Sequence, residues 1–168
     1  MKSRDLGSDM ETTPYRLVRP IAKGGMGEVF LVEHRVLETP YVLKMLRADL
    51  ASDRALEKRL KNEARLCVEL QHPNLVRVLD FGWTASGRPY LVMERLEGET
   101  LQKETARPYL PPREVIQIAK DALSGLHAAH QAGFVHRDIK PDNLFYCAPD
   151  ASGRRVLKIL DFCIAKMV

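Results

Sequence analysis

The sequence has few cysteines, and they are widely spaced. Cys67, Cys147 and Cys163 are the three cysteines in 168 residues, and they form neither a CxxC pair nor a cluster with histidine. Common zinc sites need such spacings, so a structural zinc ion is not expected. An odd number of cysteines is typical of free thiols in a reducing compartment. We therefore expect free thiols.

Long apolar runs and a charge excess of one sign are also missing. No stretch approaches the length that crosses a bilayer, and the first 13 residues lack the apolar segment of a signal peptide. The 26 Lys and Arg residues are interspersed with 22 Asp and Glu residues, without a basic stripe. We therefore expect a cytoplasmic protein with no membrane segment and no nucleic-acid partner. The composition, 45% hydrophobic and 29% charged, indicates one folded domain.

The order of apolar patterns predicts an α+β fold. Residues 1–14 have no periodic apolar pattern and are predicted to be a flexible leader. A helix is predicted to start at Ser52 or Asp53, and Glu63 lies in the middle of its apolar stripe, where a carboxylate needs a partner. A second helix is predicted at 112–131. Strands are predicted at 16–21, 28–33, 41–46, 75–81, 89–94 and 156–160.

Two features of the first half of the chain are suited to binding phosphate. Gly24, Gly25 and Gly27 separate the first two predicted strands, and their missing side chains let backbone N–H groups approach phosphate oxygens. Taken alone, these glycines are better explained by a simple hairpin turn. Lys44 lies on the third predicted strand between apolar residues. A solvated lysine is the simplest interpretation, but Glu63 is the inward acid with which such a lysine could pair.

The strongest motif is His-Arg-Asp-Ile-Lys-Pro-Asp-Asn at residues 136–143. Its fixed positions His136, Arg137, Asp138, Lys140 and Asn143 would recur by chance about once in a few million windows. An exposed charged loop is a much weaker explanation. Asp161-Phe162 follows the last predicted strand, where an acid alone indicates only a turn. The order of these segments along the chain gives Asp161 its significance.

Taken together, these segments resemble the eukaryotic-like protein kinases, in particular the Ser/Thr kinases of bacteria, over residues 15–168. The resemblance implies a protein-kinase-like α+β fold. Residues 15–96 would form a small lobe with a five-stranded antiparallel sheet, one helix and the hinge. Residues 97–168 would form the first part of a mainly helical large lobe, with its first two helices, the catalytic loop and the magnesium-binding strand end.

The resemblance also implies the role of each motif residue in transfer of the γ-phosphoryl group of ATP to a protein hydroxyl. Asp138 would accept the hydroxyl proton and Lys140 would neutralise charge on the transferred group. Asn143 and Asp161 would hold Mg²⁺. Lys44, paired with Glu63, would contact the α- and β-phosphates. The other implied ATP-binding positions are Ala22, Gly24, Gly25, Gly27, Val29, Val42, Met93, Glu94, Leu96 and Phe145.

Three departures from the family pattern leave the activity open. Ala22 replaces the first glycine of the glycine-rich loop, and Cys163 replaces the glycine that follows Asp161-Phe162. The sequence ends at Val168, before the activation segment of the family. The interpretations are therefore a Ser/Thr protein kinase domain, a catalytically silent ATP-binding or scaffold module, or a fragment of a longer kinase.

Overall fold

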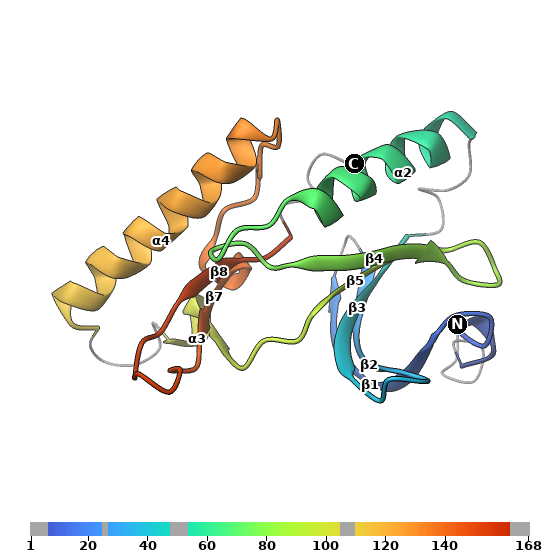
Figure 1. Cartoon of the computed structure of the whole chain (residues 1–168), viewed down its shortest axis with the longest axis horizontal. Coiled ribbons are helices and arrows are strands. Elements are labelled where there is room, and N and C mark those ends of the chain that lie inside the picture. The colour runs from blue at the N-terminus through green and yellow to red at the C-terminus, as the bar shows by residue number, and fades with distance from the viewer. Residues whose placement is uncertain (1–6, 25–26, 48–53, 105–109, 162–168) are drawn as a thin grey trace. The chain divides into compact units, whose positions relative to one another are not determined.

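The structure, a computed structural model, describes residues 7–24, 27–47, 54–104 and 110–161 (Figure 1). The chain divides into two compact units. The first comprises residues 1–68 and 78–95, and the second comprises residues 69–77 and 96–168. Each unit has its own sheet and its own buried apolar cluster.

The first unit contains a five-stranded antiparallel sheet with the strand order β1-β2-β3-β5-β4. Helix α2 (Arg54–Glu69) lies beside β4 (Figure 1), where the Lys61 ammonium is 4.8 Å from the ring centroid of Trp83. The sheet and its helix confirm the predicted fold of the small lobe. The strands are β1 (Tyr15–Gly24), β2 (Gly27–His34), β3 (Pro40–Leu46), β4 (Val78–Trp83) and β5 (Pro89–Glu94).

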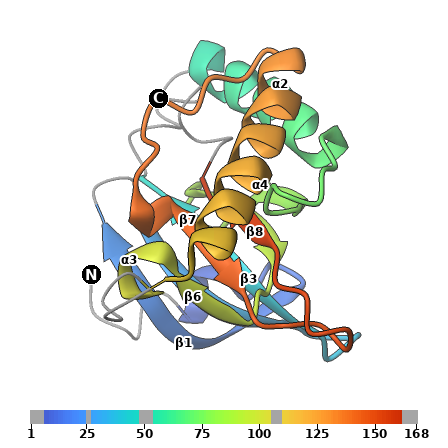
Figure 2. The ribbon, with the colours of Figure 1, turned by 90° about the vertical axis from the view of Figure 1, so that its left-hand side faces the viewer.

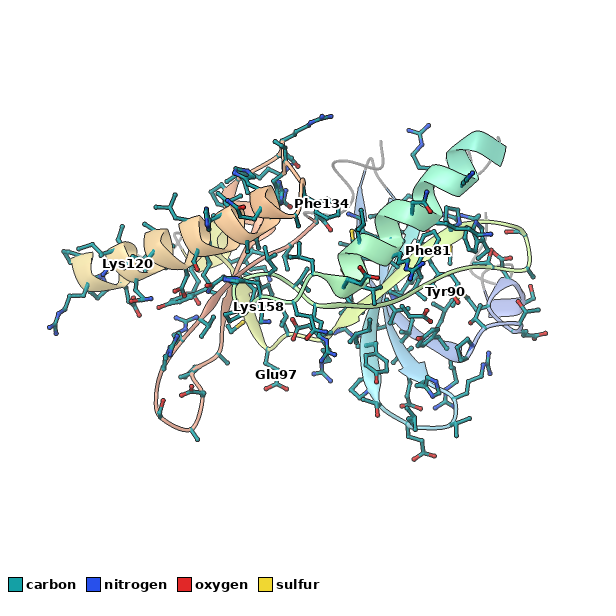
Figure 3. All side chains as sticks on the ribbon, turned by 45° about the horizontal axis from the view of Figure 1, so that its top comes forward. Phe81, Tyr90, Glu97, Lys120, Phe134 and Lys158 are labelled. Carbon is teal, nitrogen blue, oxygen red and sulfur yellow. The ribbon has the colours of Figure 1, made fainter. Side chains whose placement is uncertain are left out.

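One face of this sheet forms the core of the first unit, because every second residue of a strand points to the same side. The Tyr15 hydroxyl donates a 2.9 Å hydrogen bond to Asp80 Oδ2 within this core. Burial, and then the hydrogen bond to Asp80, raise the pKa of Tyr15, so the hydroxyl keeps its proton. The buried members of the cluster are Met10, Tyr15, Phe30, Val32, Leu43, Met45, Tyr90 and Val92, of which Tyr90 is labelled in Figure 3.

The segment before β1 packs against the sheet, which corrects the prediction of a flexible leader for residues 7–14. The Asp9 carboxylate accepts hydrogen bonds from the Ser86 backbone N–H (2.6 Å) and from Ser86 Oγ (2.9 Å). The side chain of Met10 is 1% exposed and belongs to the core cluster. A single apolar residue gives no periodic pattern, so the sequence did not reveal this contact.

We expect Met10→Ala to lower the free energy of unfolding by about 2–5 kcal/mol, because it removes most of a fully buried side chain from the core. Urea unfolding followed by circular dichroism measures the effect. Val36→Ala is the matched control, since Val36 is 81% exposed on the β2–β3 hairpin. Equal unfolding midpoints for Met10→Ala and the unsubstituted chain would show that this segment contributes nothing to stability.

The second unit contains a three-stranded antiparallel sheet, β6-β7-β8, that was not predicted. Strands β6 (Gly98–Thr100) and β7 (Leu144–Cys147) have three and four residues, too few to show a period in the sequence. The third strand, β8 (Leu157–Ile159), lies within the predicted strand 156–160. Gly98 begins β6 with φ of 134°, a value that glycine adopts easily.

The long helix of the second unit, α4 (Pro112–Gln131), has the predicted bounds. Its start has proline in the first turn, and Gly133 follows its end with φ of 79°. Figure 2 shows α4 lying over the small sheet, where Ile118 packs with Tyr146 and Leu157. Shorter elements are α3 (Leu101–Glu104) and the 3-10 helix η2 (Pro141–Asn143).

Residues 69–77 belong to the second unit, although a strand of the first sheet was predicted from Leu75 onward. The Val76 N–H donates to the Ile159 carbonyl (2.9 Å), and the Ile159 N–H donates to the Asn74 carbonyl (2.8 Å). These bonds pair the segment with β8 instead of β5. The strand of the first sheet consequently begins at Val78.

The prediction of free thiols is correct for Cys147 and wrong for Cys67. Cys147 has a free thiol, whereas Cys67 takes part in a disulfide bond. The Cys67 side chain has no exposed surface. A buried sulfur meets a second sulfur only through packing, which the spacing of cysteines along the sequence does not reveal.

Candidate active site

Three side chains of the 136–143 motif form a hydrogen-bonded cluster in the second unit. Lys140 Nζ donates to Asp138 Oδ2 at 2.8 Å. Asn143 Nδ2 donates to the same oxygen at 3.0 Å and to the Asp138 backbone carbonyl at 2.7 Å. The structure therefore brings together three of the predicted site residues around one carboxylate oxygen, and the other oxygen, Oδ1, remains able to accept a proton.

The cluster keeps Asp138 ionised and Lys140 charged. The hydrogen bond from Lys140, and then that from Asn143, hold the pKa of the Asp138 carboxyl below its usual range. The same contact with Asp138 raises the pKa of the Lys140 ammonium, and the charges of Asp142 and then Asp161 contribute. Because the pKa of Asp138 lies below the usual carboxyl range, the group takes up a proton only in acidic solution. Asp138 is therefore an anion at neutral pH.

The backbone beside the cluster is fixed by the buried imidazole of His136, which is 3% exposed. Its Nε2 lies 2.7 Å from the Leu160 carbonyl, and its Nδ1 accepts the Asp138 backbone N–H at 3.3 Å. This pattern assigns the proton to Nε2. Arg137 and Asp161 have φ of 60° and 59°, values that cost free energy for residues other than glycine. His136 therefore ties Asp138 to the end of β8, next to Asp161.

Asn143 and Asp161 fit a magnesium ion by the chemistry of their oxygens. The Asn143 amide nitrogen is oriented by its two bonds to Asp138, which leaves the amide oxygen as the acceptor. The Leu160 N–H donates to the Asn143 carbonyl at 2.8 Å and so joins the two segments. Asp161 is half-buried. An amide oxygen and a carboxylate are hard ligands of the kind that Mg²⁺ prefers.

Sequence reasoning missed Asp121, which positions β8. Asp121 is 6% exposed, and its Oδ2 accepts the Leu157 N–H at 2.9 Å. Gln117 Nε2 donates to Asp121 Oδ1 at 2.7 Å. A signal was present in the sequence: Asp121 falls on the apolar stripe of α4 between Ile118 and Ala122, as Glu63 does on the stripe of α2.

In the first unit, five of the predicted nucleotide-binding residues share the sheet face opposite the core. Val29 on β2 is paired with Lys44 on β3, and Val42 is paired with Met93 on β5. Paired residues project to the same side of a sheet, as do residues two apart on one strand. Ala22, paired with Val29, lies on the same face. The Lys44 side chain is 5% exposed, so the interpretation of a solvated lysine is wrong.

The glycine turn is the hairpin between β1 and β2, closed by the pair Gly24 and Gly27. Gly27 has φ of 145°, and a Cβ atom there would clash with the backbone carbonyl of Met45. Gly27 therefore permits the close approach of β2 and β3 at this end of the sheet. Gly25 lies outside the described residues.

The remaining predicted site residues are distributed over both units. Glu94 ends β5 in the first unit, while Leu96 and Phe145, both half-buried, belong to the second unit. Phe145 is on β7, opposite Thr100 and Lys158. Glu63 lies on α2, but its side chain and Cys163 are outside the described part of the structure.

Comparisons with known proteins identify the family of the chain. The family model described as "Protein kinase domain" matches residues 15–168. The chain is 38% identical over 154 residues to serine/threonine-protein kinase pkn2 of Myxococcus xanthus, covering 92% of this chain and 18% of that protein. It is 38% identical to PknB of Mycobacterium leprae, covering 92% of this chain and 25% of the relative.

A solved structure has the same fold. The crystal structure of the Mycobacterium tuberculosis PknI kinase domain superposes with a TM-score of 0.75 at 30% identity, covering 94% of this chain and 62% of that one. The chain thus spans about a fifth to a quarter of the length of these two curated relatives. With the family match from residue 15 to residue 168 and the five-stranded sheet, the chain belongs to the protein kinase family.

Proposed function

We propose that this domain transfers the γ-phosphoryl group of Mg-ATP to the hydroxyl of a Ser or Thr residue in a protein. The observation that carries the proposal is the cluster around Asp138, in which Lys140 and Asn143 both donate to Oδ2. Such a cluster holds a carboxylate in one orientation and keeps it ionised, as a catalytic base requires. Ser/Thr specificity is supported by the relatives, which are named serine/threonine-protein kinases.

Each residue of the cluster has a distinct task in this reaction. Asp138 orients the attacking hydroxyl and accepts its proton on the oxygen that is not engaged by Lys140. Lys140 carries a positive charge that stabilises negative charge on the transferred group. The lowered pKa of Asp138 limits its strength as a base, so its main contribution is the positioning of the hydroxyl for in-line attack.

The remaining groups hold the nucleotide. Asn143 and Asp161 would bind Mg²⁺, which neutralises charge on the phosphates. Lys44, buried on the sheet face that carries Val29 and Val42, would donate to the phosphates through its ammonium. Among the described residues, no helix is both long and apolar enough to cross a membrane.

A first test is magnesium-dependent binding of ATP. We expect calorimetry to show binding of ATP that needs Mg²⁺, and we expect Asp161→Asn to weaken it about tenfold or more, because a neutral amide replaces the anionic ligand. Asp150→Asn is the control, since Asp150 is an exposed carboxylate in the β7–β8 turn.

The outcome also separates the proposed kinase from a silent module. ATP binding that is equal with and without Mg²⁺, or that is unchanged in Asp161→Asn, would contradict the role of Asp161 as a magnesium ligand. Intact binding by the unsubstituted chain, together with no transfer in the assays described in the Discussion, would support the ATP-binding or scaffold module instead.

A further inference from the structure

The second unit contains a pocket of about 570 Å³ between the start of α4 and the β7–β8 hairpin. This volume is in the range of sites that bind small molecules, roughly 300–1,000 Å³. The pocket is open to solvent on one side and shares no residue with the Asp138 cluster. Its lining residues are Arg113, Glu114, Gln117, Tyr146, Gly153, Arg154 and Arg155.

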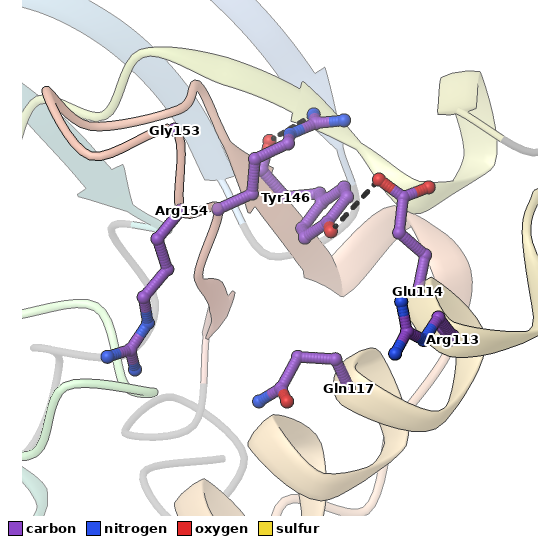
Figure 4. Close-up of a pocket in the computed structure, with 7 residues that line it drawn as sticks. Arg113, Glu114, Gln117, Tyr146, Gly153 and Arg154 are labelled. Carbon is purple, nitrogen blue, oxygen red and sulfur yellow. Dashed lines mark hydrogen bonds between the residues drawn. The ribbon is translucent and has the colours of Figure 1, made fainter.

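One wall of the pocket is rigid because its polar groups are engaged within the protein. Arg155 Nη2 donates to Glu104 Oε1 at 2.7 Å, and Arg155 Nε donates to the Cys147 carbonyl at 2.9 Å. The same guanidinium lies 3.7 Å from the centre of the Tyr146 ring. The Tyr146 hydroxyl makes a long hydrogen bond, 3.5 Å, to Glu114 Oε1 (Figure 4). Arg155 therefore shapes the pocket, and its charge is balanced by Glu104.

Arg113 and Arg154 differ from Arg155, because both are exposed and their guanidinium groups have no ion-pair partner in the described part of the chain. Figure 4 shows Arg154 on the hairpin side of the pocket and Arg113 on the α4 side, with Gln117 between them. The carboxylate of Glu114 offsets one of these two charges. Counted over the lining residues and Glu104, three arginines stand against two glutamates, which leaves one positive charge. The Gln117 amide, one N–H of which donates to Asp121, has a second N–H for a ligand.

The backbone around the pocket favours an anion as well. The helix α4 has 20 residues, its N-cap is Pro111, and no side chain caps its first turn. The N–H groups of Arg113 and Glu114 in that turn therefore add the positive end of the helix dipole to one wall.

The opposite wall is held in place by the hairpin turn. Asp150 Oδ1 accepts the N–H groups of Ser152 (2.8 Å) and Arg154 (3.0 Å), and the Asp150 N–H donates to the Arg154 carbonyl (2.9 Å). Arg154 thus extends from a hydrogen-bonded turn, which lowers the entropy cost of ordering its backbone when a ligand binds.

We infer that this pocket binds one anionic side chain, a carboxylate or a phosphate, of a polypeptide segment that passes over the open side of the pocket between Arg113 and Arg154. Guanidinium groups bind both oxyanions through paired hydrogen bonds. A nucleic-acid backbone would need a row of cations, whereas here one pocket holds a carboxylate, Glu114, that repels further anions. The pocket therefore fits a single acidic or phosphorylated residue in a peptide.

The test is fluorescence polarisation with the 168-residue chain and three labelled heptapeptides that differ only at the central residue, which is Glu, phosphoserine or Lys. We expect saturable binding of the Glu and phosphoserine peptides that weakens at high salt, and no binding of the Lys peptide. Stronger binding of the phosphoserine peptide would identify phosphate as the preferred source of the anion, and equal binding would identify the charge alone.

Variants locate the binding in the pocket. Arg113→Gln combined with Arg154→Gln is expected to weaken binding about tenfold or more. The charge-matched control, Arg19→Gln combined with Lys58→Gln on the first unit, should change it less than about twofold. Arg113→Glu combined with Arg154→Glu should bind the Lys peptide and lose the Glu peptide. All four positions are exposed, so thermal melts should coincide.

Three results would overturn the inference. These are absence of saturable binding by the unsubstituted chain, equal weakening in the control pair, and competition by a short single-stranded RNA at lower concentration than by the phosphoserine peptide. Inorganic phosphate alone should compete only weakly, because it lacks the peptide contacts. Complete competition by inorganic phosphate at the peptide's own concentration would also contradict binding of a polypeptide.

Discussion

Asp138→Asn is expected to lower the rate of phosphoryl transfer by about 10²- to 10⁴-fold while leaving the affinity for Mg-ATP nearly unchanged. The amide cannot accept the hydroxyl proton, and it no longer attracts Lys140, whose Nζ is 2.8 Å from Oδ2. The measurement uses residues 1–168 fused to the corresponding remainder of the kinase domain of PknB from Mycobacterium leprae, the relative that is 38% identical. Transfer of radiolabel from ATP to a generic basic protein gives the rate, and calorimetry gives the affinity.

The control for Asp138→Asn is Asp142→Asn, an exposed carboxylate in the same loop. We expect it to retain transfer within about threefold, because it makes no hydrogen bond to Lys140 in the cluster. A polypeptide of residues 1–168 alone is expected to transfer phosphate far more slowly than the fusion, since the protein substrate must be held in line with the γ-phosphate. Equal rates for the unsubstituted fusion and its Asp138→Asn variant would show that Asp138 is no base.

Elements whose periodic apolar pattern extends over many residues were predictable from the sequence. The helix α4 has its predicted bounds because its apolar residues recur over 20 positions and proline and glycine stand at its ends. The strand β5 also has its predicted bounds, 89–94. Strand β1 runs to Gly24, three residues beyond the prediction, because the hairpin with β2 continues to the glycine turn. Pairing with a neighbour, and not the local pattern, decides where such a strand ends.

Features that depend on tertiary contacts were not predictable. Strands β6 and β7 are too short to show a period, and they exist because each pairs with a distant segment. Met10 is buried because the chain before β1 turns back over the core. The pair of Glu104 and Arg155 joins residues 51 positions apart, and neither belongs to a motif. In each of these cases the partner lies far away in the sequence.

The candidate site also has one part that the sequence predicts and one part that it does not. That Val29, Val42 and Lys44 share a face follows from strand periodicity once the hairpins are placed, so this part could be derived from the sequence. The left-handed backbone at Arg137 and Asp161 could not, because nothing local requires φ near 60° in these residues. The hydrogen bond between the buried His136 and the Leu160 carbonyl connects these two positions and stabilises their backbone conformation.

Lys44→Met is expected to weaken Mg-ATP binding about 10- to 100-fold, because hydrogen bonds to a charged group contribute about 1.5–3 kcal/mol. The substitution suits this position, since Met has a similar length and Lys44 is only 5% exposed between apolar neighbours on β3. Lys44 also interacts with other groups of the protein, so the substitution is expected to lower the free energy of unfolding as well, and affinity is compared under conditions where both variants are fully folded. Calorimetry with Mg-ATP and a urea unfolding curve measure the two effects separately.

The matched control is Lys120→Met, which removes the same charge from an exposed position of α4. It should leave affinity unchanged within about twofold, because an exposed lysine outside the site acts on the nucleotide only through screened long-range charge. Lys44→Arg distinguishes the two properties of the lysine, charge and shape. Arginine keeps the charge but carries a wider, planar group, so binding should be intermediate if the ammonium must fit a defined space on the sheet face. Affinity in Lys44→Met equal to that of the unsubstituted chain would mean that the lysine is buried for packing, and that the nucleotide binds elsewhere.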